Sequence, residues 1–378
     1  MSSALSKEIV LSALARVEDP EIGRPITELN MVDNVEIEDN NVRVKILLTI
    51  AGCPLRDTIS TNVRAALADI SGIGTIDVEL AAMTEEQRRA LKSQLRGGST
   101  EPEIPFAQPN STTRVYAVAS GKGGVGKSSM TVNLAAALQR QGLKVGIVDA
   151  DIYGHSIPTL LGSTQGPTVL DDEMLLPPIA HDIKHISIGQ FVQGNAPVVW
   201  RGPMLHRALQ QFLADVFWGD LDVLLLDLPP GTGDVALSVA QLIPNAELLV
   251  VTTPQTAAAE VAERAGSIAQ QTRQRVAGVI ENMAAMIMPD GNKVEIFGSG
   301  GGEVVSNRLS TLLGYDVPLL GQVPLEPALR ENGDAGVPVV LADASAPASR
   351  EIESIATKLK VRRDSLAGKP LGLGVTPH

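Results

Sequence analysis

Hydrophobic and polar positions divide the 378-residue chain into two regions with different rhythms. In the first region, residues 42–50 read VRVKILLTI, and their alternation and β-branched content predict a strand. A turn signal, Asp39-Asn40-Asn41, precedes it and suggests a hairpin partner over residues 35–38. Apolar spacing further predicts helices over 4–15, 57–70 and 84–95 and a strand over 75–80. Together these elements predict a small α+β domain over residues 1–96.

The second region follows residues 97–113, which are rich in Gly, Pro, Ser and Thr and are predicted to be a linker. From Val115 onward, short apolar runs alternate with helical segments such as 127–141 and 256–271. The expected strands are 115–119, 145–149, 223–227, 247–252, 276–281 and 319–323. This alternation predicts an α/β domain over 114–364, a mostly parallel sheet with helices on both faces, followed by a loose tail over 365–378.

A glycine-rich segment follows the first strand of this second region. Residues 120–128 read SGKGGVGKS, and from Gly121 they fit the phosphate-loop pattern G-x-x-x-x-G-K-[ST]. Glycines let successive N–H groups turn toward a phosphate, and the N-terminus of the following helix adds partial positive charge. Lys127 is expected to reach the β- and γ-phosphates, and the Ser128 hydroxyl to ligate Mg²⁺. The predicted nucleotide-binding residues of this loop are Gly121, Lys122, Gly123, Gly124, Val125, Gly126, Lys127 and Ser128.

Carboxylates follow two further predicted strands. Asp149 and Asp151 lie where 145–149 ends, and alternation points them to the same side, whereas Asp227 ends the strand 223–227. The carboxyl ends of strands in an open α/β sheet face the ligand crevice. An Asp after an apolar strand commonly holds Mg²⁺, usually through water, so Asp227 is predicted to be a magnesium ligand. Asp149 either supports this metal site or caps the following turn.

A second lysine, Lys122, gives the loop the form G-K-G-G-x-G-K-[ST]. This form resembles the deviant phosphate loop of the ATPases that include nitrogenase iron protein, the septum-positioning and plasmid-partition ATPases, and the arsenite pump ATPase. The resemblance implies a homodimer in which Lys122 reaches the phosphates bound by the partner subunit. The alternative for Lys122 is an ordinary solvated lysine.

The same resemblance assigns further roles within a Mg²⁺-dependent hydrolysis of ATP to ADP and phosphate. It implies that Asp151 positions or deprotonates the attacking water, so that the catalytic residues are Lys122, Lys127 and Asp151. It also implies that Asn282, at the end of the strand 276–281, reads the adenine edge and selects ATP. A turn role is the alternative for Asn282.

Several longer segments narrow the resemblance. They read DIYGHSIP (151–158), WRGPM (200–204), LDLPPGTGD (226–234), ENM (281–283) and IFG (296–298). Together they resemble the Mrp/ApbC family of iron–sulfur cluster carrier ATPases. The N-terminal segments DPE (19–21) and AGCP (51–54) resemble the small iron–sulfur-assembly domain often fused ahead of them. This resemblance implies transfer of iron–sulfur clusters to apoproteins, with client or assembly proteins as partners.

The sequence departs from that family at two positions of the expected metal site. In the family, a Cys-Pro-x-Cys pair usually follows the Asn-x-Met run and binds a bridging cluster, but Met288 and Gly291 stand here instead. Because a thioether is a weak ligand and glycine has no side chain, the family's cluster site is not expected to form in the same way. The surrounding hairpin, 287–296, is expected to remain as a dimer contact without its metal.

The one cysteine, Cys53, then becomes the only candidate thiolate. Its predicted place is a strand-to-helix junction. A lone cysteine is most often a small buried hydrophobe. The alternative is that Cys53 contacts iron, a cluster or a client cysteine.

Composition restricts the partners. A formal charge of −12 and an aromatic content of 3% disfavour nucleic-acid binding. The chain shows no apolar run of membrane-spanning length and no signal-peptide pattern, so no membrane partner and a cytoplasmic location are expected.

Three function classes follow, of which the iron–sulfur carrier ranks first. The second is a regulatory dimeric ATPase of the positioning or partition class that acts on protein partners without a cluster. The tail 365–378 lacks the basic amphipathic helix that membrane-bound members of that class use. The third is a scaffold that binds ATP without turnover, and the complete set of Lys122, Lys127, Asp151 and Asp227 argues against it.

Overall fold

The computed structural model describes residues 5–50, 55–97, 103–151, 154–170, 174–191, 202–231, 233–255, 258–288 and 290–360. Its N-terminal domain contains a three-stranded sheet of order β1-β2-β3, in which β1 and β2 are antiparallel and β2 and β3 parallel. The strands are β1 (Val32–Glu38), β2 (Asn41–Leu48) and β3 (Ile76–Ala82), and the helices are α1 (Lys7–Leu14), α2 (Arg56–Ala68) and α3 (Glu85–Leu95). The predicted small α+β domain is therefore confirmed.

An eight-stranded sheet forms the second domain, with the order β15-β12-β11-β4-β10-β5-β9-β8. All neighbours in it are parallel except β8 and β9, which are antiparallel. The strands are β4 (Arg114–Ser120), β5 (Val145–Asp149), β8 (Ile179–Ala180), β9 (Ile183–Ser187), β10 (Val223–Asp227), β11 (Glu247–Thr252), β12 (Val276–Ala284) and β15 (Leu319–Pro324).

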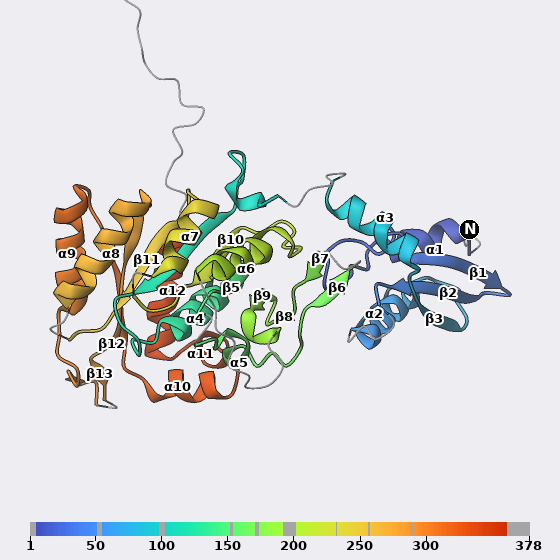
Figure 1. Ribbon diagram of the computed structural model, residues 1–378. Coiled ribbons are helices and arrows are strands. Elements are labelled where there is room, and N and C mark those ends of the chain that lie inside the picture. Colours follow the sequence, from blue (N-terminus) through green and yellow to red (C-terminus); the bar gives the residue numbers. More distant parts are fainter. Residues whose placement is uncertain are drawn as a thin grey trace, which may run out of the picture.

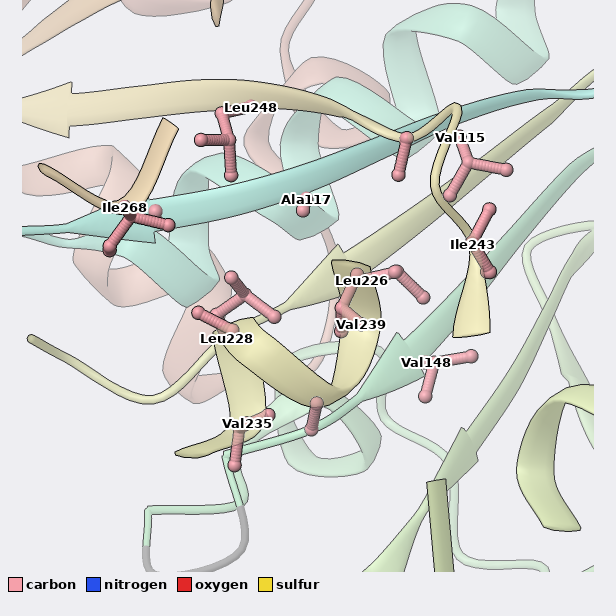
Figure 2. Packing of buried hydrophobic residues seen from close by; sticks show 14 of the residues in the cluster. Val115, Ala117, Val148, Leu226, Leu228, Val235, Val239, Ile243, Leu248 and Ile268 are labelled. Carbon is pink, nitrogen blue, oxygen red and sulfur yellow. The ribbon is translucent and has the colours of Figure 1, made fainter. Parts of the chain in front are cut away.

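Helices cover both faces of this sheet because its strands are apolar on both sides. Along β4, Val115 and Ala117 belong to one buried cluster, whereas Tyr116 and Val118 belong to the other. Figure 2 shows part of the first cluster, which is covered by α6, α7, α8 and α9. The second cluster is covered by α4, α11 and α12. The helices of this domain are α4 (Lys127–Arg140), α5 (Ile157–Leu160), α6 (Gly202–Ala214), α7 (Asp234–Leu242), α8 (Ala258–Thr272), α9 (Gly301–Leu313), α10 (Pro327–Asp334), α11 (Val339–Ala342) and α12 (Pro347–Lys360). This arrangement confirms the predicted α/β fold class.

Two small hairpins stand outside the main sheet. One consists of β6 (Thr168–Leu170) and β7 (Met174–Leu176), which lie between the two domains in Figure 1. Its apolar side chains and Phe217 belong to the same buried cluster as the N-terminal core. The other hairpin consists of β13 (Met286–Ile287) and β14 (Lys293–Val294). Hydrophobic periodicity did not predict β6 and β7, because three residues are too few to display a period.

The predicted strands 145–149, 223–227 and 247–252 coincide with β5, β10 and β11. By contrast, β12 continues to Ala284, past the predicted end at residue 281, and leads almost directly into β13. Within the described ranges, no helix combines the length and apolar character that crossing a membrane requires.

Candidate nucleotide-binding site

The glycine-rich loop connects β4 to α4, and its backbone requires glycine at two positions. Gly124 and Gly126 both have φ of +78°, a left-handed conformation that other residues rarely adopt. Gly126 also lies against Asn282, because a Cβ there would be 2.3 Å from the Asn282 Nδ2 atom. The helix α4 begins at the next residue, Lys127, so its N-terminal N–H groups face the loop.

Asp227 brings the side chains of the loop and of α4 together. The Lys127 Nζ atom lies 2.8 Å from Asp227 Oδ2, and the Ser128 hydroxyl donates to the same oxygen at 2.6 Å. The Thr131 hydroxyl donates to the other oxygen, Oδ1, at 2.8 Å. Asp227 is fully buried, and such a carboxylate needs charge and hydrogen-bond partners. Lys127, Ser128 and Thr131 supply them from one turn of helix.

The two carboxylates after β5 have different surroundings. Asp151 Oδ2 lies 4.0 Å from Lys127 Nζ, so this carboxylate borders the same cluster. Asp149 is fully buried, and its Oδ2 atom accepts hydrogen bonds from the Ser187 hydroxyl at 3.0 Å and from the Ser156 N–H at 3.2 Å. Burial, reinforced by the nearby negative charge of Asp227, raises the pKa of Asp149 to about 7. Asp149 thus caps the turn that follows it and also lies beside the metal-ligand candidate.

Lys122 is separate from this cluster. Its ammonium group donates a hydrogen bond to the Gln255 side chain in the loop after β11. The start of the phosphate loop is held from α8, where Arg264 Nη1 donates to the Gly121 carbonyl at 2.8 Å. Within one subunit, therefore, Lys122 points toward Gln255 rather than toward Asp227.

Asn282 lies behind the phosphate loop. It is 3% exposed, and its Nδ2 atom donates to the Val125 carbonyl at 2.8 Å. The amide nitrogen therefore supports the loop backbone, in addition to any role of the amide in base recognition.

The structure describes both positions at which the family carries its cysteine pair. Met288 and Gly291 both belong to the turn of the β13–β14 hairpin, where the Gly291 N–H donates to the Met288 carbonyl at 2.8 Å. Cys53 lies outside the described residues. In the part of the chain that the structure describes, no group of three or more His, Cys, Asp or Glu side chains is placed to hold a metal ion.

The structure adds four side chains that the motifs did not indicate: Thr131, Ser187, Gln255 and Arg264. Thr131 had a local signal, because it lies four residues after Lys127 on the same helix and therefore on the same face. Ser187 ends β9 and Gln255 follows β11, and the neighbours of these strands in the sheet are known only from the strand order. Arg264 reaches the loop from a helix far along the chain.

The donor set fits a magnesium nucleotide. Mg²⁺ prefers hard oxygen ligands and is usually held by one or two carboxylates together with phosphate oxygens and water. The Ser128 hydroxyl and the Asp227 carboxylate are such donors and lie 2.6 Å apart at the mouth of the loop. Lys127 lies beside both of them, where a phosphate oxygen would be its natural partner.

Comparisons with known sequences agree with this geometry. A family model described as an iron-transfer P-loop NTPase of the NUBPL type matches residues 111–360, and one described as an iron–sulfur cluster assembly protein matches residues 7–80. Proteins named iron–sulfur cluster carrier protein are 62% identical in Mycobacterium leprae and 63% in Mycobacterium tuberculosis H37Rv, over 97% of this chain and 96% of theirs. The protein of that name in Escherichia coli K12 is 39% identical over 89% of this chain and 86% of its own length.

Among solved structures, a nucleotide-binding protein from Archaeoglobus fulgidus in complex with ADP is similar to this chain. It has a TM-score of 0.51 and 38% identity, over 59% of this chain and 86% of that one. The matched segments, the parallel sheet and the phosphate loop lead to one conclusion. The chain belongs to the Mrp/ApbC family of iron–sulfur cluster carrier proteins, with a P-loop NTPase domain behind an N-terminal iron–sulfur cluster assembly domain.

Proposed function

We propose that this chain is a Mg²⁺-dependent ATPase that carries iron–sulfur clusters to apoproteins. The observation that carries the ATPase half is the convergence of Lys127, Ser128 and Thr131 on the buried Asp227, with Asp151 beside them. A lysine, a hydroxyl and two carboxylates at the mouth of a phosphate loop are the groups that phosphoryl transfer uses.

The chain's own groups would then rearrange when nucleotide binds. Lys127 would exchange Asp227 for the β- and γ-phosphate oxygens, since both partners are anionic. The Ser128 hydroxyl and Asp227 would hold Mg²⁺, which offsets charge on the phosphate oxygens when it is bound. Asp151, at the edge of the cluster, is the carboxylate placed to orient or accept a proton from the attacking water.

The homodimer belongs to the same proposal. The Lys122 ammonium contacts Gln255 and lies apart from the Lys127–Asp227 cluster of its own subunit. A lysine so placed supports the assignment in which it acts on the nucleotide of the partner subunit. Asn282, adjacent to the loop at Val125, remains the proposed reader of adenine.

The carrier half rests on the relatives, which are named iron–sulfur cluster carrier proteins and match nearly the whole chain. The cluster is the cargo, and the apoproteins that receive it are the proposed partners. A second candidate, a regulatory dimeric ATPase acting on protein partners without a cluster, is favoured by one observation. Met288 and Gly291 occupy the positions of the family's cysteine pair and offer no thiolate.

Phosphate release tests the ATPase half. Lys127→Ala is expected to lower the turnover of Mg·ATP by about 100-fold or more, because the variant loses the positive charge at the transferred phosphoryl group. Lys144 lies just before β5, at the end of that strand away from Asp149. Lys144→Ala is therefore the matched control and should retain wild-type turnover. Equal rates for Lys127→Ala and the wild type would contradict hydrolysis at this site.

Iron and sulfide analysis under anaerobic conditions separates the two candidates. Protein reconstituted with iron and sulfide should bind a cluster and transfer it to an apoprotein if the carrier assignment is right. A cluster that is lost in Cys53→Ser would identify Cys53 as a ligand. If neither the purified nor the reconstituted protein contains iron while ATP turnover is intact, the regulatory ATPase is the function.

A further inference from the structure

The end of strand β12 contains a β-bulge beside the phosphate loop. Within the described part of the chain, Glu281 is the last residue of β12 that pairs with both neighbouring strands, β11 and β15. Pairing with β15 then skips to Ala284, so Asn282 and Met283 lie opposite a single residue of β15. Met283 has a φ of +57°, a left-handed conformation that is uncommon outside glycine. Bulges of this kind re-aim side chains and are frequent next to active sites.

The bulge turns both of its side chains toward the phosphate loop. Asn282 Nδ2 donates to the Val125 carbonyl at 2.8 Å, and the Met283 Cε atom would lie 3.8 Å from a Cβ added to Gly126. In a regular strand, successive side chains point to opposite faces, so only one of the two could face the loop. Because Nδ2 is held by Val125, a base would meet the Oδ1 acceptor of Asn282. An acceptor there fits the exocyclic amino group of adenine and opposes the carbonyl oxygen of guanine.

Glu281 anchors the residue before the bulge from the opposite face of the sheet. It is 1% exposed, its Oε2 atom accepts from the Gly302 N–H at 2.5 Å, and its Oε1 atom accepts from Gln322 Nε2 at 2.9 Å. Gly302 lies in the first turn of α9, where the N–H groups carry partial positive charge that favours a carboxylate. The approach is close, since a Cβ on Gly302 would lie 2.8 Å from the Glu281 Cβ atom. Two elements, α9 and β15, therefore hold this carboxylate and fix the end of β12.

We propose that Glu281 is a positioning residue for base recognition, because it fixes the bulge that aims Asn282. The inference rests on the proposed function, in which Asn282 reads adenine. The Glu281 carboxylate faces α9 and β15, whereas the Asn282 amide faces the phosphate loop, so Glu281 acts through Asn282 and does not touch the nucleotide. Loss of the carboxylate frees the end of β12, and the Asn282 amide then loses its fixed direction.

Base discrimination tests this role, as the ratio of the Mg·GDP to the Mg·ADP dissociation constant of the full chain in isothermal titration calorimetry. Glu281→Ala should lower this ratio by about ten-fold, because Asn282 is no longer aimed at the base. Glu281→Gln should recover most of the ratio, since its amide can accept from Gly302 and donate to the Gln322 amide once that group turns over. Thr84→Ala removes the cap of α3 in the N-terminal domain. It is the control for the loss of a helix cap and should keep the wild-type ratio.

A double-mutant cycle with Asn282→Ala distinguishes positioning from general damage to the domain. If Glu281 acts through Asn282, Glu281→Ala should change the ratio in the wild type but not in the Asn282→Ala variant. Substitutions of Met283 test the bulge separately. Met283→Val should lower the ratio more than Met283→Gly, because a β-branched residue resists the left-handed conformation that glycine adopts freely. If Glu281→Ala does not fold, equal ratios for the two Met283 variants would contradict the proposal.

The proposal is wrong if the effect of Glu281→Ala persists in Asn282→Ala, or if the wild type binds ADP and GDP equally. An equal fall in affinity for both nucleotides in Glu281→Ala, with an unchanged ratio, would limit Glu281 to the stability of the domain and would also contradict it. The proposed function fails in a different way. A ratio that depends on Glu281 while ATP is not hydrolysed would overturn the ATPase and leave the role of Glu281 intact.

Discussion

At the scale of single residues, Asp227 organises the nucleotide site. Three side chains from the first helical turn after the loop bind its two carboxylate oxygens, and Thr131 is the only one of the three that the phosphate-loop pattern does not include. Because Lys127 and Ser128 are expected to turn toward the nucleotide, Thr131 is left to hold Asp227 Oδ1 in place. We infer that Thr131 is a positioning residue for the proposed metal ligand.

Thr131→Val should therefore weaken the use of Mg²⁺. Removal of one hydrogen bond to a buried carboxylate costs about 1–3 kcal/mol, which corresponds to roughly 10-fold or more in activity at limiting Mg²⁺. A magnesium titration of phosphate release measures this effect, with high Mg²⁺ expected to restore part of the rate.

The control for this titration is Thr272→Val. Thr272 makes the same bond to a carbonyl four residues earlier, at Ile268, as Thr131 makes at Lys127, but it lies at the end of α8. Identical magnesium dependence in the two variants would show that Thr131 acts only on the helix.

The buried His185 makes the free energy of unfolding depend on pH. It is fully buried in β9, and among the residues that the structure describes neither ring nitrogen has a hydrogen-bond partner of ordinary geometry. Burial lowers the pKa of His185 to about 4, from an ordinary value of 6.5. The unfolded chain therefore takes up a proton as pH falls through 6.5, whereas the folded chain stays neutral until about pH 4. Stability from this residue is present above pH 6.5 and is lost between pH 6.5 and 4.

Replacement of this histidine by an apolar residue should remove that pH dependence. Between pH 6.5 and 4 the wild type should lose about 3 kcal/mol of unfolding free energy relative to His185→Leu, as measured by urea denaturation. The raised pKa of Asp149 contributes with the opposite sign in both proteins and cancels in the difference. His206→Leu, a partly exposed position on α6, should keep the wild-type slope, and an unchanged slope for His185→Leu would contradict this account.

At the scale of elements, the phosphate loop depends on close approach as well as on backbone angle. Gly126 and Gly142 both have a left-handed φ, +78° and +82°. A Cβ on Gly126 would lie 2.3 Å from Asn282 Nδ2, whereas a Cβ on Gly142 would have open space around it. Comparing substitutions at the two positions therefore distinguishes the effect of backbone strain from that of a steric clash.

Gly126→Ala should weaken nucleotide binding, since the added Cβ displaces the Asn282 side chain, breaks its hydrogen bond to the Val125 carbonyl and strains a left-handed backbone. Gly142→Ala should cost only about 1 kcal/mol of stability and leave the affinity for ADP unchanged. Isothermal titration calorimetry with Mg·ADP compares the two variants, and equal affinities would show that the Gly126–Asn282 contact is dispensable.

At the scale of the whole molecule, the two domains share a buried cluster. Leu170, Met174 and Leu176 from β6 and β7 pack into the N-terminal core, and the Thr168 hydroxyl donates to Glu21 Oε1 across the boundary at 3.0 Å. The hairpin β6–β7 therefore joins the second domain to the first.

A charge in this cluster should release the N-terminal domain. Met174→Asp buries a carboxylate among apolar side chains, which is unfavourable. Separation of the two domains would return this carboxylate to water at the lowest cost in free energy. The radius of gyration from small-angle X-ray scattering should rise for Met174→Asp and stay constant for Val169→Asp, whose side chain on β6 is already exposed. A constant radius in both variants would show that other contacts fix the domains.

Sequence patterns predicted different parts of the molecule unequally well. The strands β5, β10 and β11 were predicted to the residue, because each is a continuous apolar run that ends in a polar residue. The short strands β6 and β7 were not, since three residues cannot show a period, whereas the hairpin that contains β13 and β14 was expected from the family resemblance. Likewise, the sequence indicated Asp227, the partner of Lys127, as a candidate site residue. It did not indicate Ser187, because the place of Ser187 beside Asp149 depends on β9 lying next to β5.

The sequence by itself determined most of the longer strands, the phosphate loop and the carboxylates after β5 and β10. Each of these depends on residue types within a few positions of one another, which composition and spacing record directly. Only the tertiary structure decided that Ser128 and Asp227, 99 residues apart, share a hydrogen bond, and that Lys122 points to Gln255. It also decided that the apolar residues around Met288 are exposed on a projecting hairpin. Such contacts follow from strand order and chain crossings, which a one-dimensional pattern does not specify.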